Sequence, residues 1–181
     1  RNPDIFIVRK EPPDEELIWE SVKEAAQAAL DSFLSMRQAE GERLAADILG
    51  RAKTVMEGVS FIEERSPQTA DAYRERLEAK MRELLSDTGV DEQRLLTETA
   101  IFADKIAVAE ETVRLRSHYA QLCALLSEGG AVGRKLDFLL QEFGREVNTI
   151  GSKAQDAGIA KTVVDIKAEL EKIREQLQNI E

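Results

Sequence analysis

The sequence predicts an all-α protein, on the evidence of its composition and of the spacing of its apolar residues. The chain has 181 residues, of which 43% are hydrophobic and 5% aromatic. Ala, Leu, Glu, Arg and Lys dominate, whereas glycine and proline number only 10 and 4. Residues with high helix propensity therefore fill most positions, as in helix-rich domains. The apolar content is enough for one buried core, with or without an extension.

The first helices are expected over residues 14–90. An acidic first turn follows Pro13, and apolar residues then recur at helical spacing as far as Ile62. Ser66 and Pro67 have the residue types of an N-cap and a first helical position, so a second helix is predicted to begin there. Gly89 is expected to end it. Residues 14–90 are therefore predicted to form a long antiparallel helical hairpin.

Residues 91–181 are predicted to form a C-terminal helical bundle. One helix is expected from Asp91 to about Ser127, with one apolar face formed by Leu95, Thr99, Phe102, Ile106, Ala109 and Val113. The next is expected to begin near Arg134 and to bury Leu136, Leu139, Leu140, Phe143, Val147 and Ile150. The last helix has apolar residues at alternating spacings of four and three: Ile159, Val163, Ile166, Leu170, Ile173, Leu177 and Ile180. Such a seam suits packing within one subunit and packing between subunits equally well, so both remain open.

Residues 1–13 are expected to be a linker and the remnant of another domain. Ile5–Val8 is a short β-type run, which Pro12 and Pro13 follow. It is too short for a signal peptide, and no segment approaches the run of about 18 apolar residues that a membrane span needs. With Cys123 as the single cysteine, an internal disulfide and a Cys/His zinc site are excluded. We expect no membrane partner.

Charge is unevenly distributed along the chain. The formal net charge is −10, which argues against a surface that binds nucleic acid everywhere. Residues 112–153, however, carry six basic and four acidic side chains, so this segment has a charge of +2 and the rest −12. Any contact with nucleic acid is expected in that segment.

The single histidine, His118, is the first candidate for chemistry. Asp104, Glu111 and His118 are seven residues apart, which places them along one stripe of a helix. A carboxylate two turns away could orient the imidazole, or the two groups could bind one cation with groups from another helix. A helical histidine without a task explains the same pattern, so both interpretations stay open.

The next expected helix carries two further candidate features. One is a pair of carboxylates, and the other is a glycine that precedes two cations. Glu142 and Glu146 lie one turn apart, and oxygen ligands at this spacing suit Mg²⁺ or Mn²⁺. A solvated charged face is the competing interpretation. Gly133 precedes Arg134 and Lys135 at the predicted start of the helix, which suits a bound phosphate and also an ordinary loop.

A set of ordered motifs within about residues 30–181 closely resembles the YicC family of bacterial endoribonucleases. The motifs are Met36–Gly41, Asp91–Arg94, Ala103–Lys105, Glu110–His118, Gly133–Glu142, Arg145–Thr149, Ser152–Lys153 and Glu171–Glu181. The resemblance implies metal-dependent cleavage of RNA in the bacterial cytoplasm by a ring-shaped homo-oligomer, with a hexamer expected. It also allows RNA-decay proteins as partners. Family members carry a β-containing N-terminal domain, of which only Ile5–Val8 is expected to remain here.

The resemblance and the spacings together give a hypothesis for the site. The catalytic residues are His118, Glu142, Arg145 and Glu146. The ligands of a divalent cation, Mn²⁺ or Mg²⁺, are Glu111, His118, Glu142 and Glu146. The residues expected to contact RNA are Arg114, Arg116, Arg134, Lys135, Asn148, Thr149, Ser152 and Lys153. With few aromatic residues, the site is expected to read the shape of RNA more than the identity of its bases.

Two other readings remain open. In the first, His118 is a metal-free general base that acts on the ribose 2′-hydroxyl, and the ends of the product RNA would distinguish it from the metal mechanism. In the second, the chain is a non-catalytic assembly or adaptor module for RNA-decay factors, with the helical hairpin as an arm.

Overall fold

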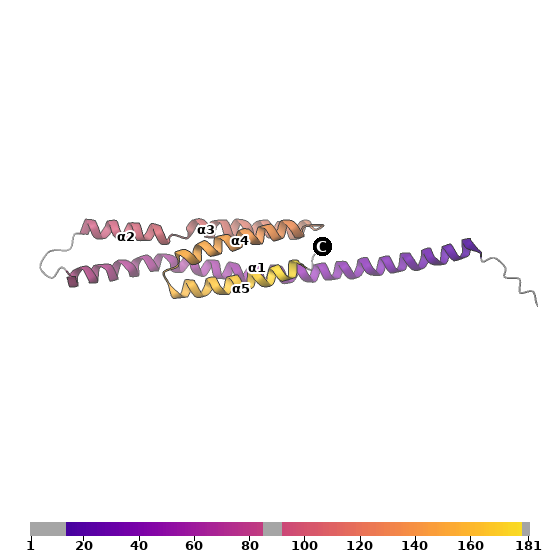
Figure 1. The fold of residues 1–181 in the computed structure, drawn as a ribbon, viewed down its shortest axis with the longest axis horizontal. Coiled ribbons are helices and arrows are strands. Elements are labelled where there is room, and N and C mark those ends of the chain that lie inside the picture. Colours follow the sequence, from indigo (N-terminus) through magenta and orange to yellow (C-terminus); the bar gives the residue numbers. More distant parts are fainter. Residues whose placement is uncertain (1–13, 85–91, 179–181) are drawn as a thin grey trace, which may run out of the picture. The chain divides into compact units, whose positions relative to one another are not determined.

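The chain is built of α-helices. The computed structural model describes residues 14–84 and 92–178, and these contain five helices and no strand (Figure 1). The helices are α1 (Glu15–Leu84), α2 (Glu92–Ile106), α3 (Ala109–Glu128), α4 (Gly133–Lys153) and α5 (Ala157–Leu177). The predicted all-α class is confirmed, whereas the expected β remnant at Ile5–Val8 lies outside the described residues. None of the described helices is long and apolar enough to cross a membrane.

The contacts divide the chain into two compact units, Arg1–Arg43 and Leu44–Glu181. In the first unit, every described side chain, from residue 14 to residue 43, is exposed. Its large exposed apolar residues are Leu17, Ile18, Trp19, Val22, Leu30, Phe33, Leu34 and Met36. This unit contains local hydrogen bonds along the helix, such as the one that Gln27 donates to Asp31 one turn later. The expected domain bounds 1–13, 14–90 and 91–181 stay a prediction.

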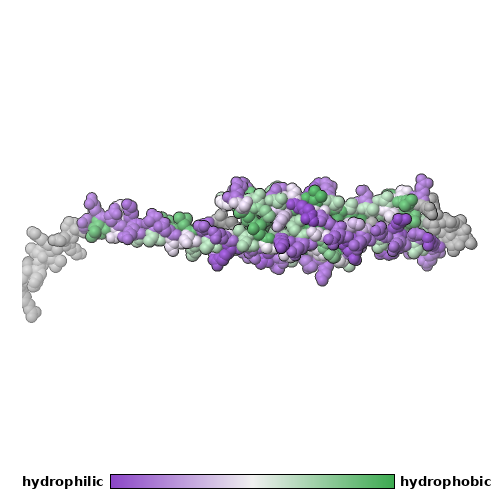
Figure 2. All heavy atoms as spheres, turned by 180° about the vertical axis from the view of Figure 1, so that it is seen from behind, coloured by the Kyte–Doolittle hydropathy of each residue, from purple (hydrophilic) through white to green (hydrophobic). Residues whose placement is uncertain are grey.

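The second unit, Leu44–Glu181, holds the hydrophobic core. Residues 48–62 of α1 pack with α3, α4 and α5 around one cluster of buried side chains, and neighbouring helices run antiparallel. The predicted apolar face of α4 is buried throughout: Leu136, Leu139, Leu140, Phe143, Val147 and Ile150. On the face seen in Figure 2, hydrophilic side chains alternate with apolar patches. This four-helix packing fixes which side of α4 faces each neighbour.

The hairpin differs from its predicted form, because α1 continues through Pro67. A proline inside a helix costs roughly 3 kcal/mol, so tertiary contacts must offset that loss. They lie on both sides of the proline. Before it, Arg116 of α3 pairs with Glu63, and after it the rings of Tyr73 and Phe102 stack with centroids 3.6 Å apart. The predicted helix start at Ser66–Pro67 is wrong, and the return arm of the hairpin consists of α2 and α3.

The helix predicted from Asp91 to about Ser127 is also divided in two. It is interrupted between α2 and α3, where Val108 is buried in the core. The interruption leaves the carbonyl of Ala107 without a helical partner, and Lys153 Nζ donates to that oxygen at 2.9 Å. One consequence is that Val113, predicted on the buried face, is 65% exposed.

The apolar seam of α5 packs within the chain. Its buried residues are Ile159, Val163, Ile166, Leu170, Ile173 and Leu177, all of which belong to the core cluster, while Ile180 lies outside the described residues. The helix begins at the N-cap Asp156, whose carboxylate accepts from the Ile159 N–H and from Arg65 of α1. These donors lower the pKa of Asp156, with the Arg65 hydrogen bond as the largest cause. Of the two readings of the seam, packing within one subunit is therefore the one observed.

Helices α1 and α5 pack closely against each other at Gly58. A Cβ atom at this position would lie 2.9 Å from two side-chain carbons of Ile166 and 3.2 Å from Cγ2 of Thr162. Gly50, two turns earlier, has no atom within 4 Å of the corresponding point. The two glycines therefore offer a matched test of the packing.

Gly58→Ala is expected to destabilise the protein by about 1 kcal/mol, because an overpacking cost of about 1–3 kcal/mol exceeds the gain in helix propensity. Gly50→Ala is expected to stabilise it by about 1 kcal/mol through propensity alone. Urea unfolding followed by circular dichroism measures both. Equal stabilisation by the two substitutions would contradict the close contact between α1 and α5.

Candidate functional site

A groove of about 610 Å³ lies between α3 and α4. We call it the α3/α4 groove. Helix α3 lines it with His118, Gln121, Ala124 and Leu125, and α4 lines it with Arg134, Lys135, Phe138, Leu139 and Glu142. Because the helices are antiparallel and each contributes residues three and four positions apart, one face of each borders the groove. Four of the predicted site residues thus share one cavity: His118, Arg134, Lys135 and Glu142.

His118 is half-buried at this groove and keeps one accessible ring nitrogen. Its ring packs at 5.7 Å from the ring of Phe143, measured between centroids. Nδ1 is buried and has no hydrogen-bond partner among the described residues. The other nitrogen, Nε2, is neither bonded to a described residue nor among the buried atoms, so it is accessible. An accessible imidazole nitrogen can form a hydrogen bond with a group bound in the groove.

The carboxylate predicted to orient His118 has another partner. Glu111 is 6% exposed, and its Oε1 accepts from Lys153 Nζ at 2.7 Å. The same ammonium group also donates to the carbonyl of Ala107 at the interruption between α2 and α3. Asp104 lies on α2, beyond this interruption. The predicted stripe of Asp104, Glu111 and His118 is therefore broken.

The predicted catalytic residues Glu142, Arg145 and Glu146 are also engaged in ion pairs. Glu142 accepts from Arg145 on the same helix. Glu146, 7% exposed, accepts from Arg114 of α3 at 3.2 Å, and this hydrogen bond is the largest cause of the raised pKa of Arg114. Glu142 faces the α3/α4 groove, whereas Glu146 helps to hold α3 to α4.

The residues predicted to contact RNA are dispersed over the fold. Arg116 pairs with Glu63 of α1, and this hydrogen bond lowers the pKa of Glu63. The hydroxyls of Thr149 and Ser152 donate to carbonyls of their own helix, at 3.1 and 2.8 Å. Asn148 lines a cavity of about 300 Å³ between α4 and α5. Two cations of the predicted set, Arg134 and Lys135, have no ion-pair partner among the described residues.

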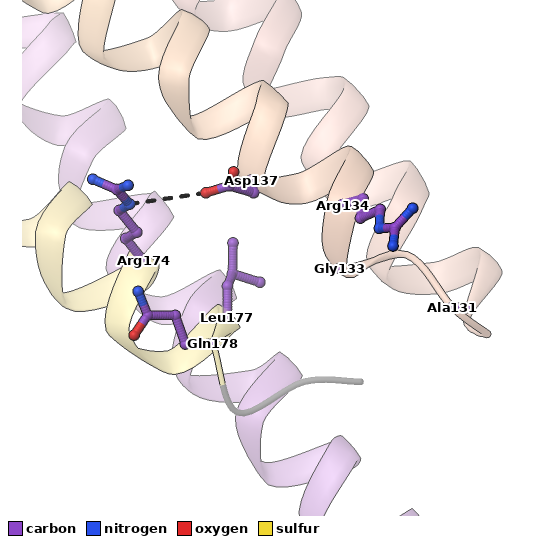
Figure 3. A pocket seen from close by; sticks show the side chains of 7 residues that line it. All are labelled: Ala131, Gly133, Arg134, Asp137, Arg174, Leu177 and Gln178. Carbon is purple, nitrogen blue, oxygen red and sulfur yellow. Dashed lines mark ion pairs between the residues drawn. The ribbon is translucent and has the colours of Figure 1, made fainter.

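Arg134 also borders a second cavity, of about 760 Å³, at the N-terminal turn of α4 and the C-terminal turn of α5. Within this cavity, Arg174 Nε lies 3.8 Å from Asp137 Oδ1. The guanidinium of Arg134 extends away from that pair (Figure 3). Its charge is therefore free to act at the mouth of the neighbouring α3/α4 groove.

The predicted metal ligands do not fit a cation site within one chain. Across residues 14–84 and 92–178, no group of three or more His, Cys, Asp or Glu side chains is placed to hold a metal ion. The physical reason is that Glu111, Glu142 and Glu146 each have a cationic partner. Of the predicted four, His118 and Glu142 border the α3/α4 groove.

The residue whose role the sequence reasoning missed is Phe138, which is 61% exposed inside the groove. A signal was present in its spacing, since it lies one turn after Lys135 and one turn before Glu142. Gln121, one turn after His118, was missed as well.

Lys153→Met is expected to destabilise the protein by about 2–4 kcal/mol, because it leaves the buried Glu111 carboxylate without a cation. The double variant Lys153→Met with Glu111→Leu is expected to recover most of that loss. Denaturant unfolding of the single and double variants measures the coupling. If Lys153→Met is as stable as the wild type, Lys153 does not hold α4 to the start of α3 and is available for other contacts.

The comparisons with known proteins match both parts of the chain. The family described as Endoribonuclease YicC-like, C-terminal, matches residues 62–181, and Endoribonuclease YicC-like, N-terminal region, matches residues 1–46. The expectation that the N-terminal domain is missing apart from a short remnant is therefore wrong, because the match to its family extends to residue 46.

Two curated relatives carry the name "Probable endoribonuclease YicC". The protein of Clostridioides difficile strain 630 is 45% identical over 180 residues, which are 99% of this chain and 61% of the relative. The protein of Haemophilus influenzae is 35% identical over 175 residues, which are 97% of this chain and 60% of the relative. The chain thus spans about three fifths of the length of these relatives. With its C-terminal match covering most of the helical bundle, the chain belongs to the YicC-like endoribonuclease family.

Proposed function

We propose that the chain is part of an endoribonuclease that cleaves RNA phosphodiester bonds at the α3/α4 groove. The observation that carries the proposal is the accessible Nε2 of His118 in a groove that also holds Arg134 and Lys135, two cations that have no ion-pair partner among the described residues. Family membership and the names of the relatives support RNA as the substrate.

The proposed chemistry uses the 2′-hydroxyl of RNA as the nucleophile. His118 accepts its proton, and the 2′-oxygen attacks the adjacent phosphorus. The bond from phosphorus to the 5′-oxygen breaks, and the leaving oxygen takes a proton from water. The products are a 2′,3′-cyclic phosphate and a 5′-hydroxyl. Arg134 and Lys135 offset the negative charge that grows on the phosphoryl oxygens.

A requirement for Mn²⁺ or Mg²⁺ stays a prediction of the family resemblance. Because Glu111, Glu142 and Glu146 are held by cations of the same chain, a metal site built on them would need ligands from a second copy or a rearrangement of these pairs. A ring-shaped homo-oligomer, with a hexamer expected, and a cytoplasmic location are proposed with it. Recruitment of RNA-decay proteins, the adaptor function, is the second candidate, which the exposed apolar residues between 14 and 43 favour.

His118→Asn is expected to slow cleavage by about 100-fold or more without a change in thermal stability, since proton transfer contributes roughly that factor. The assay uses end-labelled RNA, with and without EDTA, and analyses the product ends. Cyclic phosphate ends that persist in EDTA support the proposed chemistry. Products with 5′-phosphate ends that vanish in EDTA would instead support a metal-activated water.

Arg134→Ala and Lys135→Ala are each expected to reduce the slope of log affinity against log salt by about 0.7 for single-stranded RNA, the loss of one phosphate contact. Lys161→Ala is the control, since this exposed cation of α5 likewise lacks a partner among the described residues but lies outside the groove. Binding titrations at several salt concentrations measure the slopes. Equal slopes for all three variants would contradict a phosphate path along the start of α4.

A further inference from the structure

Phe138 is exposed on α4 and is not part of the hydrophobic core. Helix α4 already buries a complete apolar face against α3 and α5, and Phe138 lies outside that face with 61% of its surface exposed. An exposed phenylalanine forgoes about 1.5–3 kcal/mol of burial. Its ring is nevertheless set in a groove, beside Leu139 of the same helix and Leu125 of α3.

The groups around Phe138 are those that a nucleotide requires. Lys135 lies one turn before it and Glu142 one turn after it, and α3 brings His118 and Gln121 to the same groove. Cations suit a phosphate, an amide can bond the edge of a base, and an aromatic ring offers a stacking face. A volume of about 610 Å³ falls in the range of small-molecule pockets, which is enough for one nucleotide.

We propose that the α3/α4 groove takes an unpaired RNA nucleotide whose base stacks on Phe138. This inference rests on the proposed function and deepens it, because it names the substrate class as single-stranded RNA, including loops. A base inside a duplex is already stacked on both faces and cannot reach a ring in a groove unless it leaves the helix. Stacking accepts every base, since each has a π-face, so the groove selects unpaired RNA without selecting its sequence.

The test is the fluorescence of a single-stranded oligoribonucleotide that carries 2-aminopurine, whose emission falls when the base stacks. The wild type and Phe138→Trp are expected to quench it and to bind with affinities within about twofold of each other. Phe138→Leu is expected to lose the quenching and about tenfold in affinity. Phe61→Leu is the matched control, because Phe61 is also exposed, at 43%, but lies outside the groove. It is expected to behave as the wild type.

Three outcomes would overturn the inference. They are equal quenching by Phe138→Leu and the wild type, no quenching by any variant, and equal affinity of the wild type for the same sequence as a duplex. The second outcome, no quenching by any variant, is expected if the surface around Phe138 binds a protein partner instead of RNA. Thermal unfolding of each variant checks that the fold is kept.

Cleavage of the same RNA separates this inference from the proposed function. Quenching that depends on Phe138, without cleavage by the wild type, would sustain the inference and refute the nuclease. Cleavage at the wild-type rate by Phe138→Leu, without loss of quenching, would sustain the nuclease and refute the stacking role.

Discussion

The burial of one face of α4 between α3 and α5 is the constraint on which the rest of the site depends. Leu136, Phe143, Val147 and Ile150 are at most 1% exposed, so the rotation of α4 about its axis is set by core packing. That rotation directs Lys135, Phe138 and Glu142 to the α3/α4 groove. It turns Asp137, Gly144 and Asn148 to the opposite side, toward α5. The chemistry of each side therefore follows from the apolar pattern rather than from the charges themselves.

Ion pairs then decide which charges remain available. Arg114, Arg116 and Lys153 link α3 to α4, α3 to α1, and α4 to the start of α3. Half-buried pairs of this kind orient helices, and removal of one partner costs more than the pair contributes, because the other charge is left without compensation. The excess of positive charge in residues 112–153 is therefore largely used within the fold. The cations left over lie at one end of α4.

The apolar periodicity predicted much of the fold, because packing in a helical bundle follows it closely. The buried positions of α4 and α5 were read correctly from their spacing. Pro67 misled, since local propensity favours a helix start there and contacts with α2 and α3 override it. The interruption between α2 and α3 contains no glycine or proline, so no local signal marks it. The group that stabilises it, Lys153, lies more than 40 residues away in the sequence.

The ion pairs of Glu111 and Glu146 could not be predicted either, because their partners also lie far away in the sequence. Spacing shows which residues share a helix face, but not which partner a neighbouring helix supplies.

The complete exposure of residues 14–43 has a consequence for local unfolding. The described side chains of this stretch of α1 are all exposed, and helix propensity and interactions along the helix protect its backbone, whereas residues 48–62 belong to the buried core. Opening of the first stretch exposes no core, and opening of the second disrupts the whole bundle. Amide protons along this single continuous helix should thus exchange with solvent at rates that differ by orders of magnitude, fast in the first stretch and slow in the second.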